Sequence, residues 1–304
     1  MLGAGACGTV YSALHETTKA PAACKIARTV EGRKALKAEY EFLRRARKTC
    51  GLTVVEPLAL LDNIPAPDDG GEGSALLMAR LGPSIDDLFW ATTCGAGFSG
   101  NTVLRIARSM VSALAGLAEA DLVHGDCKPS NFLVSDKDEI ILTDFGTCRE
   151  RGVISNDASV VGTARFASSS ALRGEAPSPS DDLEACAYAL AYLLTGRLPF
   201  ASDYDDRTTL KASSDSSLAD AKDAVAPDLL CASSRKGEAD FDAAASACAA
   251  FLREARAARF EDRDPEYDAP VPSSTPCEPE WRAAGVSWDD SGAIHLADYD
   301  SCTT

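Results

Sequence analysis

The chain has 304 residues, of which 45% are apolar, and a formal net charge of −16. This length suffices for one or two folded domains, and the apolar fraction argues against general disorder. An acidic protein lacks the positive surface that binding to nucleic acid requires, so we expect no nucleic-acid partner. The charge is uneven, however, because Lys and Arg outnumber Asp and Glu ten to four within residues 1–50.

The N-terminal sequence and the cysteines indicate the cellular compartment. The N-terminus lacks the charged segment and long apolar stretch of a secretory signal. The most apolar run, residues 185–194, is too short to span a bilayer. No pair among the eleven cysteines has C-x-x-C spacing, so we expect free thiols, most of them buried. The sequence therefore predicts an intracellular protein of the cytoplasm or nucleus, monomeric and not bound to a membrane.

The first 80 residues are expected to form strands and one helix. Short apolar stretches at residues 8–13 and 22–27 are typical of strands. Apolar residues spaced along residues 31–48 indicate an amphipathic helix. A turn-rich loop at residues 65–73 then leads to a buried strand at 74–81.

From residue 84 onward the pattern changes to that of helices. They are expected at residues 84–91, 101–120, 181–194 and 240–258. Residues 203–224 show weak periodicity and cannot be assigned. The tail from residue 269 to 304 contains Pro and Ser clusters with few aliphatic residues, so we expect it to be irregular. The pattern predicts a small β-rich lobe followed by a larger helical lobe.

Residues 3–10 match the pattern G-x-G-x-x-G-x-V, a loop whose backbone can approach phosphates because three positions lack a Cβ atom. In a dinucleotide-binding fold, a helix would follow the third glycine directly. Here strand-like residues follow instead, and the second predicted strand carries Lys25. This order is typical of protein kinases, in which the lysine neutralises the α- and β-phosphates of ATP.

Such a lysine needs a carboxylate to hold it in place. Glu39 on the predicted helix is the candidate, and Glu41 is the alternative. We favour Glu39 because Leu43, four residues later, falls on the same helix face and can pack inward.

A second group of polar residues lies between residues 124 and 146, where H-x-D-x-K-x-x-N is followed by D-F-G. Phosphoryl transfer depends mainly on positioning and on neutralisation of charge. Asp126 would accept the proton of the attacking hydroxyl, and Lys128 would stabilise charge at the γ-phosphate. Asn131 and Asp144 supply oxygen atoms suited to Mg²⁺. His124 is expected to be a packed structural residue.

Together these motifs resemble those of the casein kinase 1 superfamily, which also includes the vaccinia-related and tau-tubulin kinases. Four further segments resemble the same superfamily: LGPSIDDLF, GTARFAS, DDLEACAYALAYLLTGRLPF and ARFEDRDPEY, at residues 81–89, 162–168, 181–200 and 258–267. GTARFAS stands where most protein kinases carry A-P-E. The resemblance extends from residue 1 to about residue 268, with a poorly matched gap at about 201–239.

The resemblance implies a bilobal α+β fold, with a β-rich N-terminal lobe over residues 1–81 and a mainly helical C-terminal lobe over residues 82–268. It also implies a serine/threonine protein kinase that uses ATP and Mg²⁺ and acts on protein substrates. Met78 would be the gatekeeper at the start of the hinge, and Asp182 would bond to the backbone of the catalytic loop. The residues expected to contact ATP are Gly3, Ala4, Gly5, Ala6, Cys7, Gly8, Val10, Ala23, Lys25, Glu39, Met78, Ala79, Arg80, Leu81 and Leu133.

Three features depart from the family pattern. Gly125 replaces the arginine of H-R-D, so we expect activity without phosphorylation of the activation segment. Arg165 matches one arginine of the family's anion site, but residues 201–210 contain three aspartates where further basic residues would be expected. A preference for acidic or for basic substrates therefore remains open. The chain also begins two residues before the first glycine, so we expect the first strand to be truncated.

Two other functions remain as alternatives. Small-molecule kinases of the aminoglycoside phosphotransferase and choline kinase type also carry H-G-D in this loop, although they commonly have His at the position of Lys128. A pseudokinase would bind partners without catalysis. Against the pseudokinase, all six polar residues expected of an active kinase are present: Lys25, Glu39, Asp126, Lys128, Asn131 and Asp144.

Overall fold

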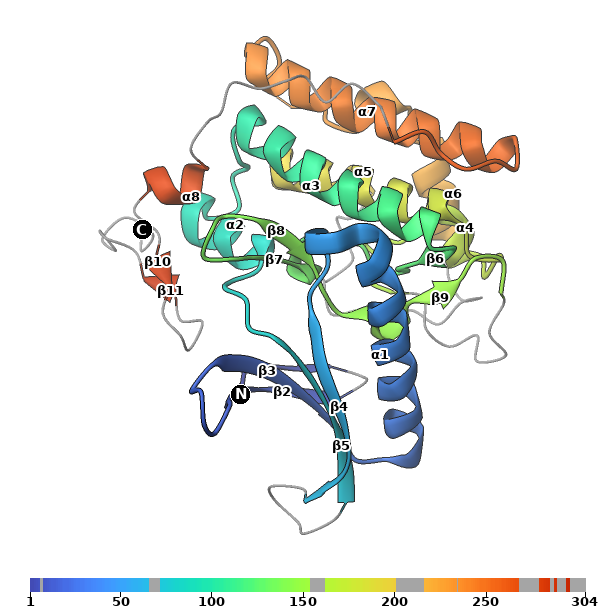
Figure 1. Cartoon of the computed structure of the whole chain (residues 1–304). Helices are drawn as coiled ribbons and strands as arrows, with labels where there is room; N and C mark the ends of the chain where they lie inside the picture. The colour runs from blue at the N-terminus through green and yellow to red at the C-terminus, as the bar shows by residue number, and fades with distance from the viewer. Residues whose placement is uncertain are drawn as a thin grey trace.

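The computed structural model of the chain describes residues 1–5, 8–65, 72–153, 162–200, 216–233, 235–267, 279–284, 287–288 and 294–295. Figure 1 shows two lobes, one formed by a β-sheet with a long helix beside it and the other mainly helical. The expectation of a bilobal α+β fold is thus confirmed.

The N-terminal lobe contains an antiparallel sheet with the strand order β1-β2-β3-β5-β4. The five strands are β1 (Gly3–Gly5), β2 (Gly8–Leu14), β3 (Pro21–Ala27), β4 (Pro57–Pro65) and β5 (Glu72–Ala79). Strand β4 was not expected from the sequence. It lies at the edge of the sheet and has a proline at each end. Proline lacks the N–H group through which a strand inside a sheet bonds to its neighbours, so it is found mainly in edge strands.

Helix α1 (Val30–Cys50) lies beside the sheet, as Figure 1 shows. The side chain of Thr29 caps its N-terminus by accepting a hydrogen bond from the Gly32 N–H. The buried residues recur at intervals of three and four, as expected for one face of a helix: Leu36, Glu39, Leu43, Ala46 and Cys50. One carboxylate therefore lies on an otherwise apolar face, and this helix presents it to the sheet.

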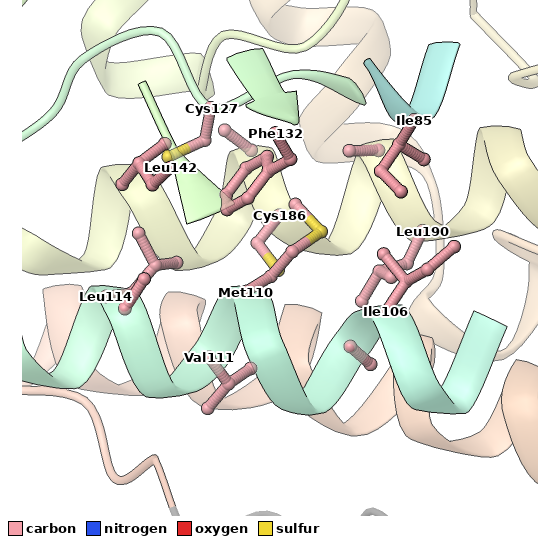
Figure 2. Close-up of a cluster of buried hydrophobic side chains, with 14 of the residues drawn as sticks. Ile85, Ile106, Met110, Val111, Leu114, Cys127, Phe132, Leu142, Cys186 and Leu190 are labelled. Carbon is pink, nitrogen blue, oxygen red and sulfur yellow. The ribbon is translucent and has the colours of Figure 1, made fainter. Parts of the chain in front are cut away.

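Three long helices form the core of the C-terminal lobe. The helices of this lobe are α2 (Ile85–Thr93), α3 (Gly100–Glu119), α4 (Ser169–Leu172), α5 (Pro179–Thr195), α6 (Ser216–Ala224), α7 (Ala239–Phe260) and α8 (Glu280–Ala283). Helix α5 packs between α3 and α7, and each of its residues from Pro179 to Leu194 is buried. Figure 2 shows Met110 of α3 close to Cys186 of α5, with Phe132 beside them. This packing forms the core against which the loops after α3 lie.

Short elements connect these helices and carry the polar motifs. Two antiparallel pairs are present, β6 (Leu122–Val123) with β9 (Arg149–Glu150), and β7 (Phe132–Val134) with β8 (Ile140–Leu142). The 3₁₀ turns are η1 (Gly51–Thr53), η2 (Pro129–Asn131), η3 (Phe145–Thr147) and η4 (Pro227–Leu229). Phe132 and Leu142 point from the β7–β8 hairpin into the core (Figure 2), so the residues at both ends of this hairpin are anchored.

The C-terminal tail differs from the expected irregular segment. It contains α8 and a small hairpin of β10 (Ser287–Trp288) and β11 (Ile294–His295). Trp281 is fully buried, with its ring 6.0 Å from that of Phe98. The tail has few aliphatic residues, and Trp281 supplies the apolar area through which it packs.

The eight cysteines that the structure describes agree with expectation except at one position. The free cysteines are Cys24, Cys50, Cys127, Cys148, Cys186, Cys231 and Cys248, and all except Cys24 are buried. Cys94, at the C-terminal end of α2, is instead bonded in a disulfide whose partner lies outside the described residues. The prediction of a free thiol at Cys94 is therefore wrong, since C-x-x-C spacing reveals only pairs that are neighbours in sequence. In the described parts of the chain, no helix is long and apolar enough to cross a membrane.

Candidate active site

Lys25 and Glu39 form a buried ion pair between β3 and α1. The Lys25 Nζ lies 2.9 Å from Glu39 Oε1 and 2.8 Å from Oε2. Both side chains are almost inaccessible, whereas Glu41 is 58% exposed and lies near Arg44. The structure thus pairs Lys25 with Glu39 and not with Glu41, because the phase of the helix turns Glu39 inward.

Asp144 reaches the same lysine from the other lobe. Its Oδ1 lies 2.8 Å from Lys25 Nζ, and about half of its side chain is exposed. Burial disfavours the charged forms of Lys25 and Asp144, but the attraction between opposite charges outweighs this effect. The attraction to Lys25 lowers the pKa of the Asp144 carboxyl, and the attraction to Glu39 and Asp144 raises the pKa of Lys25. In Glu39 burial dominates and raises the pKa, although Lys25 opposes the shift.

The catalytic loop is held from below by Asp182 of α5. Its carboxylate accepts hydrogen bonds from the backbone N–H groups of His124, at 2.6 Å, and Gly125, at 2.9 Å. The φ angle of Gly125 is +78°, a conformation that favours glycine over the arginine common at this position. The His124 ring is fully buried, and its Nε2 lies 2.9 Å from the Thr143 carbonyl oxygen. Its packed, structural role and the role of Asp182 are as expected.

Asp126 lies within a dense set of hydrogen bonds. Its Oδ1 accepts the Thr163 N–H at 2.7 Å, and its Oδ2 lies 2.7 Å from Lys128 Nζ. Lys128 also donates to Thr163 Oγ1 at 2.8 Å, and the Asn131 amide donates to the Asp126 carbonyl at 2.9 Å. The three polar residues of the motif are thus positioned by one another and by Thr163.

Thr163 is the residue of this site that the motif search did not identify. It belongs to GTARFAS, a segment recognised only through its resemblance to a family. Its distance of 37 residues from Asp126 along the chain means that no local spacing connects the two. The family-like segment itself was the one signal that pointed to it.

The described residues of the glycine loop lie on the antiparallel strands β1 and β2. Gly3 pairs with Val10, and Gly5 pairs with Gly8. The φ angle of Gly8 is +144°, and a Cβ atom there would lie 2.5 Å from the Ile26 carbonyl oxygen. Gly8 is therefore required for the close approach of β2 to β3, the strand of Lys25. Ala6 and Cys7 lie outside the described residues.

The predicted adenine pocket lies where the lobes meet. Ala23 on β3 is opposite Met78 on β5. Beyond the hinge, the Gly82 N–H donates to the Val134 carbonyl at 2.8 Å, which places the strand of Leu133 beside it. The structure thus places Ala23 beside Met78, and Leu133 beside the segment that follows the hinge.

The hinge itself, residues 79–81, also contacts two other parts of the N-terminal lobe. The Ala79 N–H donates to the Glu56 carbonyl oxygen at 2.9 Å. The Arg80 guanidinium donates to Ser12 Oγ on β2 at 2.5 Å. The Arg80 side chain therefore joins the hinge to the strand that follows the glycine loop.

The donor atoms present suit magnesium held together with phosphates. In the described parts of the chain, no group of three or more His, Cys, Asp or Glu residues could hold a metal alone. Mg²⁺ is commonly bound through only one or two side chains, with substrate phosphates and water completing its octahedron. Asn131 precedes β7 and Asp144 follows β8, both at the end of the hairpin where Phe132 pairs with Leu142, and they fit that requirement.

Comparisons with known proteins agree with this geometry. A model of the protein kinase domain matches residues 1–235. Casein kinase I homolog 1 of Saccharomyces cerevisiae is 32% identical over 216 residues, covering 66% of this chain and 37% of the relative. Casein kinase I homolog RAG8 of Kluyveromyces lactis is 30% identical over 215 residues, with coverages of 66% and 38%.

A third relative is more distant in its source. A probable casein kinase I homolog of Encephalitozoon cuniculi is 35% identical over 136 residues, covering 42% of this chain and 44% of the relative. In each of the three cases, the matched region spans less than half of the relative's length.

Proposed function

Because the chain is a casein kinase 1-like member of the protein kinase domain family, we propose that it transfers the γ-phosphoryl group of ATP to serine and threonine hydroxyls of proteins. The observation that carries this proposal is the convergence of Lys25, Glu39 and Asp144 in one ion-pair cluster. Lys25 and Glu39 are buried and paired with one another, and this pairing offsets the cost of burying their charges.

Each polar residue has a role in this proposal. Asp126 orients the acceptor hydroxyl and takes its proton, and Lys128 stabilises the charge of the transferred group. Lys25, fixed by Glu39, binds the phosphates of ATP. Asn131 and Asp144 would hold Mg²⁺, which supplies neutralisation of the phosphate charge when bound.

The test uses radiolabelled ATP with Mg²⁺ and three acceptors: casein, a basic protein and an aminoglycoside. We expect label on serine and threonine of the proteins, and its loss in Asp126→Ala, because the acceptor hydroxyl then lacks its base. Asp121→Asn, an exposed carboxylate outside the site, is the matched control and should keep full activity.

The other functions predict different results in the same assay. Label on the aminoglycoside alone would indicate a small-molecule kinase. Retained ATP binding without transfer to any acceptor would indicate a pseudokinase. Either result contradicts the proposal.

Substrate charge preference belongs to the same proposal. Arg165 stacks over the Tyr192 ring, with its guanidinium carbon 5.4 Å from the ring centre, while residues 201–210 lie outside the described residues. An array of phospho-primed, acidic and basic peptides distinguishes the two preferences left open by the sequence. Monomeric state and a cytoplasmic or nuclear location stay predictions.

A further inference from the structure

Lys222 on α6 is a fully buried lysine that none of the sequence motifs includes. Its Nζ donates hydrogen bonds to the carbonyl oxygens of Ala164, at 2.8 Å, Arg165, at 3.0 Å, and Ala167. An ammonium group has three N–H donors and no acceptor, so three converging carbonyls match its full hydrogen-bonding capacity. All three acceptors belong to the segment of residues 162–168.

The surroundings of Lys222 hold the amino group in place. The Tyr188 and Phe200 rings lie 4.9 and 5.0 Å from Nζ, within the range of cation–π attraction. Arg256 of α7 donates to the Lys222 and Val225 carbonyl oxygens, both at 2.9 Å, and so ties the end of α6 to α7.

Helix α6 also packs against the same segment through apolar contacts. Leu218 and Ala219 form a small cluster with Ala164, Ala167 and Leu172, separate from the main core. Leu218 lies four residues before Lys222, on the same helix face. Leu218 and Lys222 thus contact the same segment from one side of α6. Figure 1 shows this helix beside α4.

The segment held by Lys222 continues directly into the catalytic site. Thr163, one residue before Ala164, donates to Asp126 and accepts from Lys128. An acceptor hydroxyl must come within hydrogen-bond reach of Asp126, so a peptide carrying it must pass beside this segment. A displacement of these carbonyls would therefore be transmitted to the place where the peptide binds.

We propose that Lys222 is a positioning residue for the protein substrate: by holding the carbonyls of residues 164–167, it fixes the segment along which the acceptor peptide lies. The proposal rests on the proposed protein kinase function. The proposal assigns Lys222 to peptide binding and not to ATP binding, because ATP binds through Lys25 and the glycine loop in the other lobe.

The test compares Lys222→Met with the wild type and with Lys236→Met, an exposed lysine of the same lobe. Methionine has similar length but no donor. We expect the KM for a peptide substrate to increase about tenfold, since small misplacements near the chemistry are costly. The KM for ATP and the slow hydrolysis of ATP without peptide should not change. Amide hydrogen exchange should become faster within residues 163–168 and remain unchanged in α3.

Lys222→Arg provides the same comparison should the methionine variant fail to fold, because it keeps the charge but not the geometry of three converging bonds. An unchanged peptide KM in the folded variants, or an equal loss of ATP and peptide binding, would overturn the proposal. Failure of the wild type to phosphorylate any peptide would instead reject the proposed function. In that case hydrogen exchange within residues 163–168 still decides whether Lys222 holds the segment.

Discussion

Among the residues that the structure describes, each lobe buries one lysine, and the two are stabilised in different ways. Lys25 in the N-terminal lobe is paired with two carboxylates, Glu39 and Asp144. Lys222 in the C-terminal lobe is surrounded by three neutral carbonyls and two aromatic rings. The carboxylates raise the pKa of Lys25 despite its burial, whereas burial lowers the pKa of Lys222 to about 7.

This difference shows which of the two lysines can exchange a contact within the protein for a contact with a ligand. Asp144 is half exposed, so phosphate oxygens can compete with its carboxylate for Lys25 without leaving a buried group unpaired. The carbonyls around Lys222 have no such access to solvent or ligand, and they belong to a single segment. An ion pair with an exposed carboxylate thus suits a lysine that binds a ligand. Hydrogen bonds to several carbonyl oxygens suit a lysine that holds the backbone in place.

The largest expected effect comes from Lys25→Met. Loss of the phosphate-binding charge should lower kcat/KM for peptide phosphorylation by about 10²–10³-fold, the magnitude typical of one lost transition-state contact. The measurement is steady-state kinetics, with a thermal melt to show that the variant is folded. Lys37→Met, an exposed lysine on α1, is the control and should retain wild-type kinetics. Comparable losses in both variants would contradict the assignment.

A smaller effect is expected from Glu39→Gln. The amide keeps a hydrogen-bonding oxygen but loses its charge, so Lys25 is held less firmly and the KM for ATP should increase about tenfold. Glu41→Gln on the same helix serves as the matched control, because that carboxylate is exposed. If the two substitutions raised the KM for ATP equally, the buried pair would have no special role.

The two lysines should also differ in their effect on stability against pH. Between about 7 and 10.5, folded Lys222 has released a proton that the unfolded chain still holds, so the free energy of unfolding increases with pH. The slope contributed is at most about 1.4 kcal/mol per pH unit. Glu184 opposes the lowering, and the value of about 7 includes its effect. Lys25 has a raised pKa, so it is protonated in both states up to about pH 9 and contributes no slope there.

Urea unfolding at several pH values measures this difference. The wild type should gain stability relative to Lys222→Met as the pH rises above 7, whereas Lys236→Met, the exposed control, should run parallel to the wild type. Parallel curves for all three proteins would mean that the pKa of Lys222 is not lowered.

The smallest effect is expected from Phe200→Leu, which removes one ring from beside Lys222. Below pH 7, where Lys222 is charged, the loss of one desolvated cation–π contact should reduce the free energy of unfolding by about 1–2 kcal/mol. The effect should shrink when the same change is made in Lys222→Met, because the charge is then absent. An undiminished effect in that double-mutant cycle would show that packing alone explains it.

The sequence predicts best those parts of the site that depend on local spacing. Asp126, Lys128 and Asn131 lie within one short loop, and Glu39 follows from the phase of a single helix. Such relations involve few residues and one periodicity, so they can be recognised without knowledge of the rest of the fold.

Features that depend on distant partners were not predictable. Lys222 reads as a surface charge because lysine is rarely buried, and its three acceptors lie 55–58 residues earlier in the chain. Strand β4 was missed because its prolines argue against a strand unless its edge position is known. The expected irregular tail omitted Trp281, whose burial depends on contact with Phe98.

The contact between the tail and α3 has a consequence for the order in which the protein folds. The Ser99 N–H, at the start of α3, donates to Glu280 Oε2 at 2.8 Å across 181 residues of chain. During synthesis, α3 leaves the ribosome long before Glu280 and Trp281 do. The helix must therefore wait with the apolar surface around Phe98 uncovered, and such long-range closure is slow and exposes the chain to aggregation. Completion of this lobe is thus delayed until residue 281 has been made.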